Sequence, residues 1–243
     1  MMPRFCIASR CGAGLGPENS ILALKRSLAA TVHAVNVDVR LADGELFVLR
    51  SERLEECTNG YGFVDEQPIS YLRSLHVGGG SPIATLAHVI ETVNHACPVL
   101  IDIRTQETAE AVVDMLHFHI REKGWHYDDF VVASPLYDEL RSVKYFDHHI
   151  TTSMIVSGIP LFLQQCARAL DASSIRFEKG YVTPEVVESC QMSGFQVHAG
   201  VVDIEEEMER MHACGVDAIL TNYPDRLLRW ASHRRSRECT APR

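Results

Sequence analysis

The stretch AVNVDVRLADGELFVLRSERLEECTNG, residues 34–60, decides how the chain folds. Apolar and polar residues alternate over residues 35–39, which is typical of a β-strand and places Asn36 and Asp38 on one face. A turn signal follows, and a second extended run then ends at Arg50. Two polar side chains on one strand face, with a cation close behind them, indicate part of a functional site. A strand with one solvated face is the alternative interpretation.

The composition of the chain limits its class. Its 243 residues are 46% hydrophobic and 23% charged, which is ordinary for one soluble globular domain with a sizeable core. The net charge of -9 argues against nucleic acid or an anionic membrane as the main partner. No run approaches the ~20 apolar residues of a membrane span, and the first residues lack the apolar core of a secretory signal. We therefore expect a cytoplasmic protein.

The cysteines support the same compartment. Eight cysteines are scattered along the chain, and no C-x-x-C pair appears among them. Buried free thiols in a reducing compartment are the expected state of these residues.

Strand-like and helix-like segments alternate along the chain. The predicted strands cover residues 4–9, 35–39, 99–103, 130–134, 149–156, 173–177, 195–202 and 218–221. The predicted helices that follow them cover residues 21–30, 83–95, 107–123, 136–144, 160–169, 183–192, 204–213 and 224–230. A shorter extended run (45–50) and a short helix (68–75) stand between the second strand and its helix.

Eight such units predict a TIM (β/α)8 barrel in the α/β class, a single domain over residues 1–230. An open doubly wound sheet is the alternative. Residues 231–243 are rich in arginine and serine, and we expect them to be a basic, disordered tail.

Barrel enzymes place their chemistry at the carboxyl ends of the strands. The polar or small residues expected there are Ser9, Arg10, Asn36, Asp38, Arg50, Asp102, Arg104, Ser134, Gly200, Thr221 and Asn222. Two carboxylates and three arginines in one barrel mouth suit an anionic ligand, and phosphate is the leading candidate because guanidinium groups bind it in a bidentate manner. Ion pairs without a ligand are the alternative.

The sequence resembles the glycerophosphodiester phosphodiesterase family nearly from end to end. Residues 7–20, IASRCGAGLGPENS, are similar to the family's opening H-R-G and P-E-N-T motifs. Residues 34–62 are similar to its E-x-D-V, D-G, H-D and T-N-G segment, and residues 81–91 to its P-I-P-T-L segment. LIDIR, residues 100–104, resembles the family strand that ends in E-x-K, and residues 215–227 resemble its closing G-V-D-G-I-I-T-D-Y-P-D. The resemblance implies a TIM barrel that cleaves glycerophosphodiesters with a divalent cation.

The departures from the family pattern fall on the chemistry. The two catalytic histidines of the family fall on Ser9 and Arg50, and the aspartate after the second one falls on Ser51. The metal-binding glutamate falls on Asn36, while Asp38 is kept. Three further changes belong to the same set: the third carboxylate is shortened to Asp102, the phosphate-facing lysine becomes Arg104, and a tryptophan is replaced by Gly200.

These changes predict impaired catalysis. Serine is a poor proton donor at neutral pH and guanidinium stays protonated, so no catalytic residue is assigned. Positioned acid and base groups contribute on the order of 10²–10⁴-fold each. The neutral amide of Asn36 weakens the binding of a magnesium or calcium ion by Asp38 and Asp102. We expect Arg50 to pair with these carboxylates in place of the cation, and Arg10, Arg104 and Arg50 to bind phosphate.

Other candidate catalysts are weaker. His198 is predicted to point into the barrel as a packed, hydrogen-bonded residue. His148 and His149 lie at the non-catalytic end, where a metal role is not expected, and Cys11 is interpreted as an unreactive loop thiol.

Three functions remain open at the level of sequence. The first is an impaired family member that binds a phosphodiester, another phosphorylated small molecule or a protein partner. The second is an active metal-dependent phosphodiesterase with a rearranged site. The third is head-group transfer of the kind that sphingomyelinases D catalyse. This sequence resembles those related barrels in having an aspartate at position 102.

Overall fold

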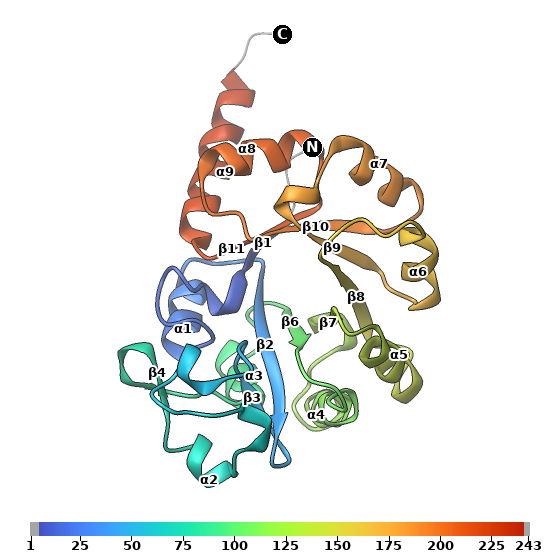
Figure 1. Ribbon diagram of the computed structural model, residues 1–243. Coiled ribbons are helices and arrows are strands. Elements are labelled where there is room, and N and C mark those ends of the chain that lie inside the picture. Colours follow the sequence, from blue (N-terminus) through green and yellow to red (C-terminus); the bar gives the residue numbers. More distant parts are fainter. Residues whose placement is uncertain (1–4, 241–243) are drawn as a thin grey trace.

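Eight parallel strands close into a barrel, which confirms the predicted (β/α)8 fold. The computed structural model describes residues 5–240. Strand β1 pairs in parallel with both β2 and β11, and this double pairing closes the ring (Figure 1). The barrel strands are β1 (Phe5–Ala8), β2 (Ala34–Ala42), β6 (Val99–Ile103), β7 (Phe130–Ser134), β8 (Thr151–Val156), β9 (Ser174–Glu178), β10 (Gln196–Gly200) and β11 (Ala218–Thr221). The first predicted strand also included Arg4, which lies outside the described residues.

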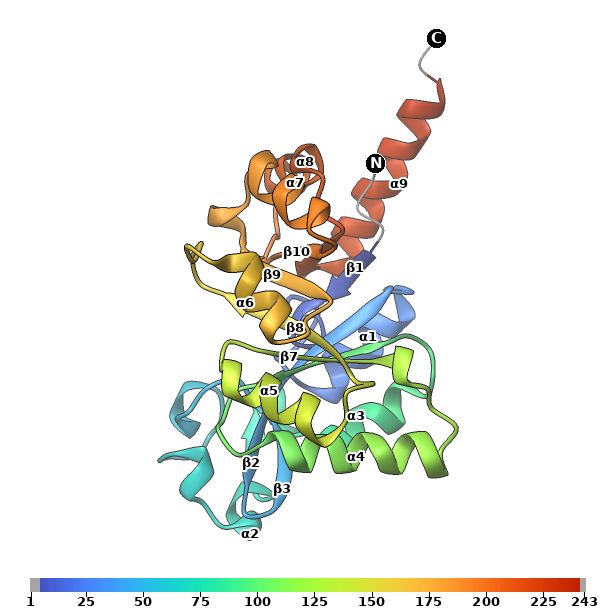
Figure 2. The same cartoon turned by 90° about the vertical axis from the view of Figure 1, so that its right-hand side faces the viewer.

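Helices surround the barrel and cover the outer face of its sheet (Figure 1, Figure 2). They are α1 (Ile21–Ala29), α3 (Leu86–Val93), α4 (Ala109–Glu122), α5 (Tyr137–Phe146), α6 (Leu163–Ala169), α7 (Pro184–Met192), α8 (Glu205–Cys214) and α9 (Pro224–Thr240). The main core lies between helices and strands and includes the outward-facing Val37, Ile101 and Phe177. Because side chains alternate along each strand, the even-numbered residues of β2 point into the barrel instead, so Asn36 and Asp38 reach its interior.

A small insertion follows β2 and stands at the edge of the barrel. Its elements are β3 (Glu45–Val48), which pairs antiparallel with β2, together with α2 (Ile69–Leu72), β4 (His76–Val77) and β5 (Ser81–Pro82). The insertion has its own apolar cluster, which includes Phe47, Leu54 and Leu72. The buried Arg40 of β2 fixes it, since Arg40 Nε donates to the carbonyl of Arg50 at 3.2 Å and one terminal nitrogen donates to Asp65 at 3.4 Å. These contacts place Arg50 beside the barrel opening.

The last helix is longer than the sequence predicts. Residues 231–243 were expected to be disordered, but α9 continues to Thr240 and projects away from the barrel in both views (Figure 1, Figure 2). No proline or glycine interrupts residues 225–240, and Arg234 forms an ion pair with Glu209 of α8. A charged segment without helix breakers therefore extends the helix. The remainder of the expected tail, residues 241–243, lies outside the described residues.

The cysteines are free thiols where the structure describes them. Cys6, Cys11, Cys97 and Cys190 are buried, as expected, whereas three further cysteines are half-buried: Cys57, Cys166 and Cys214. Across residues 5–240, none of the helices has the length and apolar character required to traverse a bilayer.

A buried carboxylate joins two neighbouring βα units. Glu139 of α5 is 5% exposed, and its carboxylate accepts hydrogen bonds from the backbone amides of Glu107, Thr108 and Ala109 at 2.8, 3.0 and 2.8 Å. These amides stand at the start of α4, where no earlier turn can accept from them. Glu139 thus caps α4 from a different helix and complements its dipole.

Replacing this carboxylate should destabilise the barrel. We expect Glu139→Ala to lower the free energy of unfolding by about 2 to 3 kcal/mol, because buried amides lose their acceptor. The neighbouring Asp138→Ala is the control, since the Asp138 side chain is 93% exposed and pairs only at the surface with Arg141. That change should shift stability by less than about 0.5 kcal/mol. Equal effects of both substitutions in urea unfolding would contradict the capping role.

Candidate functional site

A cavity of about 590 Å³ opens at the carboxyl ends of the barrel strands. It brings together eight of the residues expected at the mouth: Ser9, Arg10, Asn36, Asp38, Arg50, Asp102, Arg104 and Gly200. Ser134, Thr221 and Asn222 lie outside this cavity and make structural contacts. Ser134 Oγ donates to the carbonyl of Ile103 at 3.0 Å, and Thr221 Oγ1 donates to Asp203 at 3.0 Å. Both residues end their strands in outward-facing positions.

Two carboxylates and two guanidinium groups form a continuous set of ion pairs in the mouth. Arg104 Nε and one of its terminal nitrogens both lie 2.6 Å from Asp38 Oδ1, and a terminal nitrogen lies 3.0 Å from Asp102 Oδ2. Arg176 of β9 reaches the same Asp102 oxygen from across the barrel at 2.5 Å. We call Asp38, Asp102, Arg104 and Arg176 the mouth ion-pair network. Its formal charges cancel.

Burial makes these pairs mutually dependent. The side chains of Asp38 and Asp102 are 1% and 2% exposed, so neither charge is solvated by bulk water. Burial alone would lower the pKa of Arg104, but the carboxylates of Asp102 and Asp38 outweigh it and raise that pKa. Asp102 Oδ1 is buried without a hydrogen-bond partner, so Asp102 relies on the two guanidinium groups at its other oxygen.

Arg50 does not have the role expected from the sequence. Arg50 is exposed and forms no ion pair with any residue from 5 to 240, whereas Arg104 and Arg176 neutralise the carboxylates. The reason is geometric. Arg104 follows Asp102 by two positions and leaves the strand on the same face, while Arg50 belongs to the insertion at the rim.

A divalent cation does not fit between Asp38 and Asp102. Asp38 Oδ1 is taken by Arg104, and Asp38 Oδ2 accepts from Asn19 Nδ2 at 3.1 Å. Asp102 Oδ2 is held by two guanidinium groups, and Asn36 Oδ1 accepts from the amide of Arg10 at 3.4 Å. Magnesium and calcium require about six oxygen ligands, and two fixed positive charges already occupy the centre of this donor set.

The loop after β1 is tied to the mouth by amide side chains. Ser20 caps α1 by accepting from the amide of Ala23 at 3.1 Å. Asn19 has a positive φ of 57° and pairs with Asp38 instead. Arg10 donates to Glu18 at 2.5 Å and to Asn222 Oδ1 at 3.0 Å, so this arginine is fixed at the cavity wall.

The loop holds no activated nucleophile. Burial, with a smaller contribution from Asp38, raises the pKa of the Cys11 thiol far above its usual range, so Cys11 is an unreactive thiol. Ser9 is 3% exposed, and no described histidine lines the cavity to activate it.

His198 lies inside the barrel, as predicted, but not as a fully hydrogen-bonded residue. It is 8% exposed, it stands beside Arg176 in the register of β9 and β10, and its Nδ1 has no hydrogen-bond partner. Burial first, and then the positive charge of Arg176, lower the pKa of His198 to about 4. His198 is therefore a neutral interior residue at neutral pH.

Several cations at the mouth were missed by sequence reasoning. Arg176, Lys179 and Arg210 line the cavity together with the three predicted arginines. Arg176 was detectable, because it lies with Ser174 and Glu178 on the polar face of the alternating strand SIRFE. Lys179 and Arg210 gave no comparable signal, since they lie in a loop connection and on a helix surface.

The comparisons with known proteins agree with the barrel fold. Residues 10–226 match the model of the glycerophosphoryl diester phosphodiesterase family. The chain belongs to this family. It is 29% identical to a glycerophosphodiester phosphodiesterase of Caldanaerobacter subterraneus subsp. tengcongensis, with 93% of this chain and 97% of the relative covered. It is 24% identical to one of Bacillus altitudinis, with 91% and 96% covered.

The fold of this phosphodiesterase family member also matches solved structures. The structure of an Oleispira antarctica phosphodiesterase in complex with the product sn-glycerol-3-phosphate superimposes with a TM-score of 0.86 at 22% identity, covering 94% of this chain and 96% of that chain. The family generally uses a divalent cation. The mouth ion-pair network is a departure of this member from that general pattern.

Gly200 is constrained by its neighbour Leu220. A Cβ atom added to Gly200 would lie 2.7 Å from Cβ of Leu220, closer than van der Waals contact allows. A tryptophan could enter this position of the family member only if Leu220 moved. The packing of β10 against β11 therefore limits the size of the side chain at this position.

The buried imidazole of His198 should make stability depend on pH. Its pKa is about 4 in the fold and 6.5 when unperturbed, so acidification protonates the unfolded chain first. The free energy of unfolding should be highest above pH 6.5 and should fall by up to about 3 kcal/mol as the pH approaches 4. In His198→Gln this loss should be absent, while the exposed His88→Gln should behave as wild type. If urea unfolding gave the same pH dependence of the free energy of unfolding for wild type and His198→Gln, the imidazole would not be the cause of the loss at low pH.

The mouth ion-pair network should make added hard cations ineffective. We expect millimolar magnesium or calcium chloride to leave the melting temperature unchanged relative to sodium chloride of equal ionic strength, because a ligand stabilises only the state that binds it. The measurement is a thermal melt at increasing metal concentration. A saturable rise in Tm that disappears in Asp38→Asn would contradict this account.

Proposed function

We propose that this family member binds a phosphate-bearing small molecule at the barrel mouth and does not carry out the family's cation- and histidine-dependent hydrolysis. A phosphodiester of the glycerophosphodiester type and a phosphomonoester such as sn-glycerol-3-phosphate are the ligands considered. Such ligands and the free thiols of the chain fit a cytoplasmic setting, which is part of the proposal.

One observation carries the proposal: the mouth is positive on an acidic protein. The cavity lining has six cationic side chains (Arg10, Arg50, Arg104, Arg176, Lys179 and Arg210) against three carboxylates (Asp38, Asp102 and Glu178), a formal charge of +3. The chain as a whole carries -9. A positive cleft on a negative surface concentrates anions at that one place, because low-dielectric walls focus the field.

The cations of the mouth have different tasks in this proposal. Arg104 and Arg176 neutralise the buried carboxylates, while Arg10 and Lys179 pair with Glu18 and Glu207, the latter at 2.6 Å. Arg50 and Arg210 line the cavity, and neither forms an ion pair with a carboxylate in the described part of the chain. Arg210 donates to the carbonyl of Lys179 at 2.9 Å, which leaves its other donors open. We assign phosphate binding first to Arg50 and Arg210, with Arg10 and Arg104 as the wall behind them.

The same residues argue against hydrolysis. The positions of the family histidines hold Ser9 and Arg50, and neither side chain is a useful general acid or base at neutral pH. Loss of two positioned acid and base groups would remove on the order of 10⁴–10⁸ in rate if their effects multiplied. An active metal-dependent phosphodiesterase with a rearranged site is the competing function, and the retained Asp38 and Asp102 are the observation that favours it.

Calorimetric titration with sn-glycerol-3-phosphate tests the binding. We expect saturable binding to wild type, no binding of glycerol, and at least about tenfold weaker binding in Arg50→Ala, since a charge-assisted hydrogen bond contributes about 1.5–3 kcal/mol. Arg53→Ala is the matched control, because Arg53 belongs to the same insertion, pairs with Glu55 and does not line the cavity. No heat of binding to wild type, or equal losses in Arg50→Ala and Arg53→Ala, would contradict the proposed site.

A turnover assay separates the two functions. With glycerophosphocholine and a chromogenic phosphodiester, in the presence of magnesium, calcium or manganese, we expect no release of product above the buffer rate. Turnover that is lost in Asp38→Ala would establish the active enzyme and overturn the proposal. Turnover that persists in Asp38→Ala would indicate a contaminant and leave the barrel mouth inactive, as proposed.

A further inference from the structure

A cluster of histidines surrounds one carboxylate at the end of the barrel opposite the mouth. Asp147 follows α5 directly, and His148 and His149 lead into β8. Because the strands are parallel, the residues before β8 lie at the amino ends of the strands. The mouth ion-pair network lies at their carboxyl ends. This cluster therefore belongs to a separate region of the molecule.

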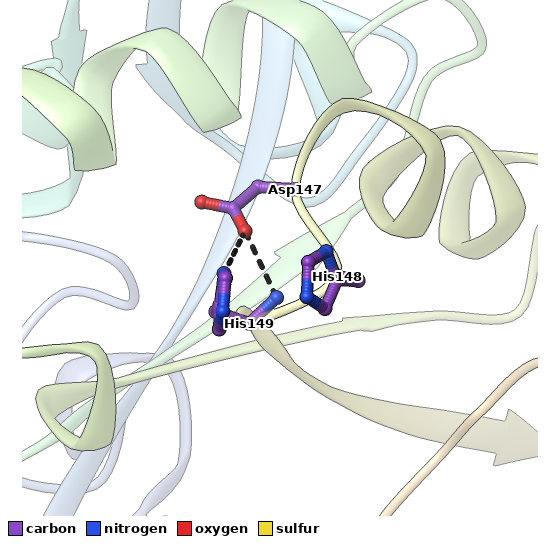
Figure 3. Close-up of side chains that lie close together, drawn as sticks. All are labelled: Asp147, His148 and His149. Atoms are coloured by element: carbon purple, nitrogen blue, oxygen red, sulfur yellow. Dashed lines mark hydrogen bonds and ion pairs between the residues drawn. The ribbon is translucent and has the colours of Figure 1, made fainter.

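The three side chains converge on one point (Figure 3). The carboxylate of Asp147 and one ring nitrogen from each of His148 and His149 lie within 4.8 Å of one another. His149 Nδ1 is 3.0 Å from Asp147 Oδ1, and the two imidazole rings lie side by side with their centres 3.9 Å apart. Two nitrogens and one oxygen at this spacing form a donor set of the kind that binds a transition-metal ion.

The carboxylate is held in place from its other side. Asp147 Oδ2 lies 2.8 Å from His117 Nε2 of α4 and accepts a hydrogen bond from the hydroxyl of Tyr127 at 2.8 Å. The amide of His149 donates to Oδ1 at 2.9 Å. The Asp147 side chain is 9% exposed. Burial alone would raise the pKa of this carboxyl, but the hydrogen bonds outweigh burial and keep the pKa far below its usual range. Asp147 is thus an ionised carboxylate whose orientation is fixed by residues that would not touch an ion at Oδ1.

The two imidazoles, by contrast, are accessible. His148 is exposed, and the side chain of His149 is 61% exposed. An ion can reach this cluster from solvent without any movement of the barrel. It would find one buried carboxylate of fixed orientation and two exposed imidazoles.

We propose that Asp147, His148 and His149 form a binding site for a divalent transition-metal ion of the zinc class. Asp147 Oδ1, His149 Nδ1 and a ring nitrogen of His148 are the ligands, and solvent completes the coordination. His149 then carries its proton on Nε2, and the ion replaces the proton that it shares with Asp147. His117 and Tyr127 orient the carboxylate, as hydrogen-bonded partners of metal ligands commonly do.

The donor set selects the metal. Magnesium and calcium prefer oxygen ligands and need several of them, whereas this cluster offers one carboxylate and two imidazoles. Zinc accepts such mixed nitrogen and oxygen ligands in a four-coordinate arrangement. A simple ion pair between Asp147 and a protonated His149 would explain their contact without any metal, but it would not need His148.

The exposed His148 provides the sharpest test. We expect zinc ions, titrated against a chromophoric chelator, to bind one equivalent tightly to wild type. His148→Ala should bind at least about tenfold more weakly, and His117→Ala about 10- to 100-fold more weakly although it removes no ligand. His88→Ala, an exposed histidine on α3, is the matched control and should bind zinc as wild type does. His148→Ala keeps the backbone carbonyl that accepts from Lys144, so its fold should be intact in a thermal melt without metal.

The half-buried thiols are the competing ligands, and cobalt distinguishes them. Cobalt bound in place of zinc should give visible bands of nitrogen and oxygen coordination without the near-ultraviolet charge transfer of a thiolate complex. Absence of tight zinc binding to wild type would overturn the proposal. Zinc affinity unchanged in His148→Ala, or a cobalt–thiolate spectrum, would overturn it as well by assigning the ion to cysteines or another site.

Discussion

The ion pairs among Asp38, Asp102, Arg104 and Arg176 are the constraint on which the mouth of this barrel depends. Two carboxylates with almost no solvent exposure must be compensated, since a lone buried charge costs several kcal/mol. Arginine supplies the compensation here, from β9 across the barrel and from the residue that follows β6. The four side chains together form a charge-neutral network at the carboxyl ends of the barrel strands.

The remaining cations act from the rim because the interior is already neutral. Arg40 anchors the insertion through the backbone of Arg50, which directs the Arg50 side chain to the opening rather than to the carboxylates. Arg10 is fixed by Glu18 and Asn222, so the loop after β1 forms a firm wall of the cavity. The site therefore combines a neutral floor of buried ion pairs with a positive rim, and the proposed binding of an anion depends on this combination.

The sequence predicted the fold well because its information is periodic. Alternation along the strands placed Asn36, Asp38 and Asp102 inside the barrel, and the motif blocks indicated the family that the comparisons then confirmed. Pairing could not be predicted in the same way. Which arginine reaches which carboxylate depends on distances across the barrel, so Arg176 was missed and Arg50 was given its role. The continuation of α9 was missed because charge was interpreted as disorder although no residue there breaks a helix.

The most direct test of this account is calcium binding by the wild-type chain and by a variant with both Arg104→Met and Arg176→Met, measured by calorimetry. If the guanidinium groups stand in for the cation, wild type should show no binding. The double variant, with Asp38 and Asp102 released and uncompensated, should gain calcium binding and recover in melting temperature as calcium is added. Calcium binding by the wild type as tight as that of the double variant would contradict the account, because the arginines would then not occupy the place of the ion.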